Sequence, residues 1–203
     1  MSTSSKRAHG AGDDASGPFA PIWIRALFLA IGGASLCSLV LAEVDDWRSS
    51  GSDEIPAFLA AEVLDRPAPD FSLYDGRDRS IELIDLRGKT VLLSFWATWC
   101  PSCVDELPEL AELERQLAGR GLVVVAASVD EDWAEVELLL GDDEPSFAVV
   151  WDEGARVARS YGTFKYPESY LIDRDGRVRA RFVGSRSWAS PEVVAFFESF
   201  ARQ

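Results

Sequence analysis

Between residue 71 and the C-terminus of this 203-residue chain, the spacing of the hydrophobic positions changes several times. Residues 71–83 alternate between apolar and polar side chains on both sides of the pair Asp75-Gly76, which is typical of a β-hairpin with a tight turn. Residues 90–96 then form an apolar run of strand length, as in a strand that is covered on both faces of a sheet. The pattern therefore predicts a hairpin followed by a central strand.

Helical and strand-like segments alternate after this central strand. Apolar positions with helical spacing predict helices at residues 101–117, 133–140, 155–161 and 191–201. Stretches of β-branched and apolar residues predict strands at residues 122–129 and 147–151, and a hairpin made of residues 168–173 and 177–184. This order of elements predicts an α/β fold in which helices cover both faces of a mixed sheet.

The N-terminal part of the chain has the composition of a targeting segment. Residues 1–20 lack periodic apolar positions and are expected to be a disordered tail. Residues 21–42 contain a single charged side chain, Arg25. As a helix they reach about 31 Å, which is enough to cross the hydrocarbon core of a membrane. We predict a transmembrane signal anchor, and a signal peptide cleaved after Ala42 is the open alternative.

Charges on the two sides of this segment predict its orientation. Basic side chains precede it, and acidic residues, Glu43, Asp45 and Asp46, follow it. The positive-inside rule then leaves the tail in the cytoplasm and places everything after residue 42 outside the cytoplasmic membrane. Residues 43–66 are expected to be a linker with a short helix near its end, and residues 67–203 the folded domain.

The overall charge disfavours one class of partner. The chain has 20 basic and 34 acidic residues, which gives a formal net charge of −14. An acidic surface repels the phosphates of nucleic acids, so no nucleic-acid partner is expected. Contact with the membrane is expected through the N-terminal helix alone.

Two of the three cysteines stand where the central strand gives way to a helix, in the sequence WATWCPSCVDELPEL of residues 96–110. Cys100 falls at the predicted helix start, and Pro101 suits the first helical position because its missing N–H would have no partner there. The positive end of the helix dipole lowers the pKa of the Cys100 thiol. Cys103, one turn later, lies at a separation compatible with a disulfide. The spacing predicts that Cys100 attacks and Cys103 resolves.

Glu106 lies three residues beyond Cys103, on about the same side of the predicted helix. In an apolar setting the pKa of its carboxyl would be raised, which suits it to exchange a proton with Cys103. The alternative is a solvated helix glutamate like Glu109 and Glu112. Spacing alone leaves both interpretations open.

Other chemistries of a C-x-x-C pair fit this chain less well. Zinc needs four ligands, but the chain has no second cysteine pair and its one histidine, His9, lies in the predicted cytoplasmic tail, so neither a metal nor another cofactor is expected. The same shortage of histidine argues against Cys-His acyl transfer. A purely structural disulfide is the remaining alternative, but so small a loop stabilises a fold only slightly.

Three segments resemble the TlpA/ResA/CcmG (DsbE) family of membrane-anchored thioredoxin-like oxidoreductases: APDFSL, FWATWCPSCVDELPEL and YPESYLIDRDGRV. The resemblance runs from about residue 66 to the C-terminus. It implies a thioredoxin fold with an added N-terminal hairpin and a central βα insertion at residues 133–161. It also implies that Cys100 is the attacking thiol, Cys103 the resolving thiol and Glu106 the buried acid that tunes them.

The same resemblance implies roles for residues around the cysteines. Tyr166-Pro167 is expected to be a cis peptide bond that packs against the cysteines and presents backbone to a substrate. Tyr166 would line that groove, although the family usually has a smaller residue there. Trp99 would shield the thiols, with packing in the core as the open alternative, and Pro101 would support the helix start.

The function implied by the resemblance is the reduction of protein disulfides outside the cytoplasmic membrane. The expected partners are a disulfide-containing protein, such as apocytochrome c during cytochrome c maturation, and a thiol-conducting membrane protein that supplies electrons. The triplet Pro167-Glu168-Ser169 is close to the P-E-T pattern of the cytochrome c maturation branch.

Three alternatives stay open to different degrees. A dithiol oxidant has the same residues, because the direction of electron flow depends on the reduction potential. A copper(I)-delivery protein would use the two thiolates as soft ligands. A peroxiredoxin is disfavoured because Ala97 and Leu93 replace the threonine and proline expected before its reactive cysteine.

Overall fold

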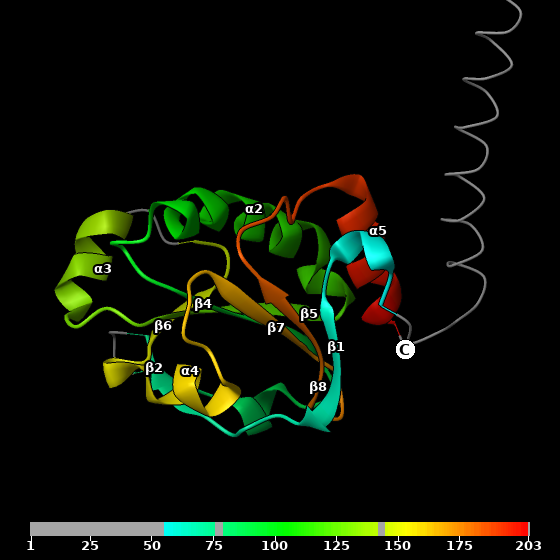
Figure 1. Ribbon diagram of the computed structural model, residues 1–203, viewed down its shortest axis with the longest axis horizontal. Coiled ribbons are helices and arrows are strands. Elements are labelled where there is room, and N and C mark those ends of the chain that lie inside the picture. The colour runs from blue at the N-terminus through cyan, green and yellow to red at the C-terminus, as the bar shows by residue number, and fades with distance from the viewer. Residues whose placement is uncertain (1–54, 76–78, 142–144, 203) are drawn as a thin grey trace, which may run out of the picture. The chain divides into compact units, whose positions relative to one another are not determined.

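An eight-stranded mixed sheet runs through the described part of the chain, which is residues 55–75, 79–141 and 145–202 of a computed structural model (Figure 1). The strands lie in the order β1-β8-β7-β4-β5-β6-β2-β3. Their bounds are β1 Glu62–Pro67, β2 Ser72–Tyr74, β3 Ser80–Glu82, β4 Thr90–Trp96, β5 Leu122–Ser128, β6 Ala148–Trp151, β7 Glu168–Ile172 and β8 Arg177–Val183.

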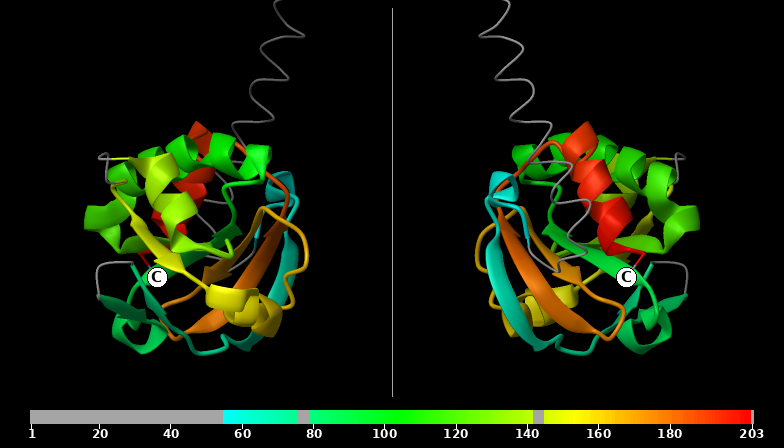
Figure 2. Two further views of the ribbon diagram at one scale, coloured as in Figure 1. Left: turned by 90° about the vertical axis from the view of Figure 1, so that its left-hand side faces the viewer. Right: turned by 90° about the vertical axis from the view of Figure 1, so that its right-hand side faces the viewer.

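Four α-helices of the described part cover the two faces of this sheet. They are α2 Pro101–Leu117, α3 Trp133–Leu140, α4 Arg156–Tyr161 and α5 Pro191–Phe200. Figures 1 and 2 show α2, α3 and α5 on one face and α4 on the other. Short 3₁₀ helices complete the described elements: η1 Ala57–Leu59, η2 Leu83–Leu86, η3 Ala118–Arg120 and η4 Glu153–Ala155.

The central strand β4 is buried at all seven positions, as the apolar run predicts. It pairs in parallel with β5 along its whole length and antiparallel with β7 on its other edge. Because both edges are paired and both faces are covered, a strand of this kind has no solvent-facing side and its sequence does not alternate.

Two aromatic clusters join the sheet to the helices on its two faces. Phe182 of β8 meets the rings of Trp188 and Phe197 at centroid distances of 5.3 Å and 6.4 Å. On the face that α4 covers, the rings of Tyr161 and Tyr170 lie 5.1 Å apart. Large buried aromatic side chains of this kind contribute much of the apolar area that stabilises a domain.

Most expected elements are present within one or two residues of their expected ends. The sheet is mixed and has helices on both faces, the hairpin of β2 and β3 precedes β4, and β6 with α4 falls in the region expected for the insertion. The predicted tail, the transmembrane segment and the linker up to residue 54 lie outside the described residues. No helix within residues 55–75, 79–141 and 145–202 is both long and apolar enough to span a membrane.

One boundary of the sequence analysis needs correction. Residues 62–66, assigned there to the linker, form most of the edge strand β1, which pairs with β8. Val63 is 66% exposed and the strand has no fully buried residue, so the hydrophobic alternation that marks a strand is missing. Backbone pairing and ion pairs hold it instead, including Arg177 with Asp65 at 2.6 Å.

We expect Leu93→Ala to lower the free energy of unfolding by about 3 kcal/mol, because Leu93 is fully buried in β4 and its truncation leaves a cavity. Urea unfolding followed by circular dichroism measures this. The matched control is Leu138→Ala on α3, where the side chain is 86% exposed and the same change should cost less than about 0.5 kcal/mol. Equal costs for the two variants would contradict this description of the core.

Candidate active site

Cys100 and Cys103 form a disulfide at the start of α2. Their sulfurs are 2.07 Å apart and their Cα atoms 5.3 Å apart. Cys100 is the N-cap residue, with extended backbone angles, and its carbonyl oxygen accepts the backbone N–H groups of Cys103 and Val104. Cys100 is 7% exposed and Cys103 is 1% exposed, so Cys100 is the more accessible of the two.

The surroundings of Cys100 favour its ionised form once the disulfide is reduced. Cys100 lies at the N-terminus of a 17-residue helix, where the positive end of the helix dipole favours a negative charge. The hydroxyl of Ser102 lies 3.6 Å from the Cys100 sulfur, within reach of a hydrogen bond to it. Sequence reasoning missed Ser102, because a serine between the two cysteines carries no pattern of its own.

Asp130 anchors the loop that leads from β4 to Cys100. Its carboxylate, fully buried just beyond the end of β5, accepts the Thr98 backbone N–H at 3.0 Å and the Thr98 hydroxyl at 2.7 Å. The Ser128 hydroxyl donates to the same carboxylate at 2.6 Å. Asp130 was not among the predicted site residues. A usable signal existed, because the carboxyl ends of neighbouring parallel strands meet at one edge of a sheet.

The second loop of the site contains the expected cis peptide bond between Tyr166 and Pro167. The Pro167 carbonyl oxygen accepts the Gly184 backbone N–H at 3.0 Å. The ring of Tyr166 meets the ring of Trp99 edge to face at a centroid distance of 5.8 Å, which brings the two loops together. Trp99 is 61% exposed, so packing in the core, the alternative for this residue, is wrong.

Glu106 lies on the same helix, one turn beyond Cys103, and its side chain is buried at 3% exposure. Its Oε1 atom accepts the Arg186 backbone N–H at 3.2 Å and the indole N–H of Trp188. Burial raises the pKa of this carboxyl to about 7, since the loss of solvation outweighs the two hydrogen bonds and the nearby Arg186, which lower it. The solvated alternative for Glu106 is therefore wrong.

A buried ion pair follows the cis-proline. Glu168 is 1% exposed, and its carboxylate binds the Arg181 guanidinium at 2.6 Å. The hydroxyl of Tyr170 donates to the same carboxylate at 3.3 Å. The charge of Glu168 is thus compensated within the protein and helps to hold the start of β7. Glu168 belongs to the Pro167-Glu168-Ser169 motif of the sequence, but no sequence pattern predicts its pairing with Arg181.

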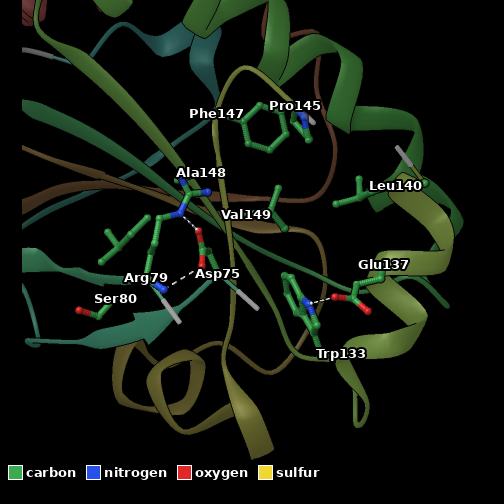
Figure 3. A pocket seen from close by; sticks show the side chains of 12 residues that line it. Asp75, Arg79, Ser80, Trp133, Glu137, Leu140, Pro145, Phe147, Ala148 and Val149 are labelled. Atoms are coloured by element: carbon green, nitrogen blue, oxygen red, sulfur yellow. Dashed lines mark hydrogen bonds and ion pairs between the residues drawn. The ribbon is translucent and has the colours of Figure 1, made fainter. Parts of the chain in front are cut away.

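A separate hollow of about 530 Å³ lies between the β2–β3 hairpin and α3 (Figure 3). Four of its polar side chains form two pairs: Arg79 binds Asp75, and the Trp133 indole donates to Glu137 at 3.0 Å. None of the cysteines, Glu106 or Pro167 lines it. The hollow is therefore not part of the dithiol site.

This combination of features defines a class of protein. The dithiol lies at the start of a helix, a cis-proline loop lies beside it, and the central strand of a mixed sheet pairs in parallel with β5 and antiparallel with β7. These are the features of a thioredoxin-fold oxidoreductase. The dithiol can exchange with a disulfide in another molecule, because attack by one thiolate and release by the second need no cofactor.

Comparison with known proteins agrees with this class. Residues 64–181 match the model of the AhpC/TSA family. The thiol-disulfide oxidoreductase ResA of Bacillus thuringiensis (strain Al Hakam) is 35% identical over 124 residues, which is 61% of this chain and 72% of ResA. ResA of Bacillus subtilis (strain 168) is 36% identical over 111 residues, 55% of this chain and 62% of that protein.

A solved structure shows the same relationship. A thiol:disulfide interchange protein DsbE from Chlorobium tepidum superimposes with a TM-score of 0.57 at 34% identity, over 60% of this chain and 86% of that one. The chain belongs to the AhpC/TSA family and, within it, to the TlpA/ResA/DsbE-like group. It is a thiol-disulfide oxidoreductase.

We expect Glu106→Gln to stabilise the oxidised protein above neutral pH. The carboxyl has its pKa raised from 4.5 to about 7, so its contribution is fully favourable below about pH 4.5 and is lost as the pH rises through 7. Glutamine keeps an acceptor for Arg186 and Trp188 but never ionises. Relative to the wild type, the variant should gain about 3 kcal/mol between pH 4.5 and pH 8.

Urea unfolding at the two pH values, with the disulfide intact, measures this gain. Glu114, whose pKa burial raises to about 6, also titrates in this range but is present in both proteins and therefore cancels. A difference between the proteins that does not change with pH would show that folding does not raise the pKa of Glu106.

Proposed function

We propose that this oxidoreductase reduces protein disulfides outside the cytoplasmic membrane, with Cys100 as nucleophile, Cys103 as resolving thiol and Glu106 as proton donor and acceptor. The observation that carries the proposal is the joint placement of these groups on the first turns of α2. Cys100 lies at the accessible helix start, whereas Cys103 and Glu106 are buried behind it.

The reaction transfers two electrons in two exchange steps. The Cys100 thiolate attacks one sulfur of the target disulfide, forms a mixed disulfide and releases the other target sulfur as a thiolate. Cys103 then loses its proton to Glu106 and attacks the Cys100 sulfur. The target leaves with both sulfurs reduced, and Cys100 and Cys103 are left as the disulfide of this structure.

The groups around the cysteines suit an extended polypeptide as substrate. Trp99 and Phe164 are 61% and 75% exposed, and Tyr166 joins Trp99 in an edge-to-face pair. Exposed aromatic side chains of this size are common anchors for a partner. In this proposal they flank the segment that carries the target disulfide, while the backbone beside Pro167 binds it.

The proposed location and partners follow from the sequence. The orientation predicted for residues 21–42 exports the catalytic domain to an oxidising compartment, so a reductant there needs electrons from a thiol-conducting membrane protein. Apocytochrome c is the proposed target, which is supported by the similarity of Pro167-Glu168-Ser169 to the pattern of the cytochrome c maturation branch. Under this proposal the segment is an anchor and contributes no catalytic group.

The main competing function is oxidation of dithiols, which reverses the same steps. A copper(I) site would use the reduced pair of sulfurs and would compete with disulfide exchange. Peroxidase chemistry stays disfavoured within the AhpC/TSA family. The two positions that would carry its threonine and proline hold Ala97 and Leu93, both fully buried apolar residues.

We expect Cys103→Ala to accumulate mixed disulfides through Cys100, since the attacking thiolate remains and nothing resolves the intermediate. Non-reducing gels of the full-length protein from cells, followed by mass spectrometry, should show covalent adducts that disappear on reduction. Apocytochrome c among the trapped proteins supports the proposed target.

The control is the double variant Cys100→Ala/Cys103→Ala, which keeps Cys37, the third cysteine of the chain, and should trap nothing. If Cys103→Ala traps no protein in cells and the purified wild type does not reduce insulin, the proposed reductase function is wrong. If proteins are trapped but none of them is a cytochrome, the reductase function stands and apocytochrome c is wrong as the proposed target.

We expect Glu106→Gln to slow the reduction of insulin by at least about tenfold near pH 7, because general acid–base catalysis by a positioned side chain typically contributes about 10²–10⁴. The wild-type rate should also change with pH around the raised pKa of about 7, and this dependence should vanish in the variant. Glu112→Gln is the matched control, because this partly exposed glutamate lies six residues further along α2 and pairs with Arg115. An unchanged rate and pH profile in Glu106→Gln would remove Glu106 from the mechanism.

A further inference from the structure

The loop between β8 and α5, residues 184–190, supplies both hydrogen-bond donors to the buried carboxyl of Glu106. One is the backbone N–H of Arg186, at 3.2 Å, and the other is the indole N–H of Trp188. Both donors meet the same oxygen, Oε1. Oε2 has no hydrogen-bond partner among residues 55–75, 79–141 and 145–202. The two oxygens of this carboxyl are therefore chemically different.

This asymmetry determines where a proton can bind. An sp² oxygen has two lone pairs, and on Oε1 both are directed to donors. A proton on Oε1 would displace one of these hydrogen bonds and leave a buried N–H without a partner, which is costly. Oε2 can take and release a proton without breaking either hydrogen bond.

Trp188 is held so that its indole N–H cannot turn away. The side chain is fully buried, and its ring packs on Phe182 at 5.3 Å and on Phe197 at 5.9 Å between centroids. The guanidinium of Arg186 lies over the same ring at 5.3 Å, and it donates to the Leu59 carbonyl oxygen of η1 at 2.5 Å. Packing on three sides fixes the donor in position.

We propose that Trp188 is a positioning residue that sets the proton affinity of Glu106 and directs the exchanged proton to Oε2. This inference rests on the proposed role of Glu106 in exchanging a proton with Cys103. Trp188 contacts neither the cysteines nor a substrate in this proposal. It acts through the carboxyl alone.

The charged and titratable groups that face Glu106 come from two elements. On α2 the charged neighbour is Glu109, whose negative charge raises the proton affinity of Glu106, and Cys103 lies one turn before Glu106 on the same helix. From the β8–α5 loop, the half-buried Arg186 guanidinium lowers it. Trp188 is neutral, so removal of its N–H changes the hydrogen bonding of Glu106 without changing any of these charges.

The test compares Trp188→Phe with the wild type in the full-length protein, with the disulfide intact so that neither cysteine of the pair titrates. Carbon-13 NMR of labelled glutamate carboxyl groups follows the titration, and the Glu106 signal is the one missing in Glu106→Gln. The indole N–H of Trp188 favours the ionised form of Glu106. Its removal should therefore raise the titration midpoint of Glu106 from about 7 by about one pH unit. The matched control is Trp96→Phe, because the indole N–H of Trp96 is buried but has no hydrogen-bond partner in the described part of the chain.

A second measurement leaves Trp188 in place. The indole N–H signal of Trp188 in the wild-type protein should shift with pH at the Glu106 midpoint and should stop shifting in Glu106→Gln, whereas the Trp96 signal serves as an internal reference. An unmoved Glu106 midpoint in folded Trp188→Phe, or an indole signal of Trp188 that ignores pH, would overturn the proposal.

These outcomes separate the inference from the proposed function. In the reduced enzyme, the pH profile of insulin reduction should move upward in Trp188→Phe together with the Glu106 midpoint. A midpoint that moves while the rate profile stays fixed supports the control of Glu106 by Trp188 and contradicts the catalytic role of Glu106. A midpoint that stays fixed while Glu106→Gln slows the reaction contradicts only the role of Trp188.

Discussion

The distance along the chain between the end of β4 and the start of α2 governs the chemistry of this protein. β4 is paired on both edges and buried on both faces, and residues 97–99 alone separate it from Cys100. Cys100 is therefore confined to the N-terminus of α2, where the positive end of the helix dipole favours a thiolate. The sheet positions the reactive sulfur, and Asp130 fixes the short loop that connects them.

The helix that positions Cys100 also confines Glu106 to a buried location. A group three residues beyond Cys103 on α2 lies against the sheet side of the helix, where solvation is lost and the charged form is disfavoured. Two donors from the β8–α5 loop oppose this effect without cancelling it. The resulting pKa of about 7 leaves the carboxyl able both to give and to take a proton near neutral pH, as proton exchange with a thiol requires.

The sequence predicts features that depend on local spacing and misses those that depend on distant partners. Cys100, Cys103 and Glu106 share one helix, so their spacing alone brings them together. Trp188 is 82 residues away from Glu106 along the chain, and no local pattern connects the two. The strand β1 was missed for a related reason, because pairing with β8 and ion pairs hold it rather than an apolar face.

The buried carboxyl groups in the described part of the chain differ in how many hydrogen bonds and ion pairs their oxygens accept. This difference singles out Glu106. Asp130 and Asp152 accept hydrogen bonds on both oxygens, and Glu168 has an arginine partner. Glu106 has donors on one oxygen only, and Glu114 has one backbone donor. These two are the buried carboxyls with a raised pKa. Since Glu114 is eight residues further along α2, Glu106 is the one buried acid among the described residues that has donors on a single oxygen and lies one turn beyond Cys103.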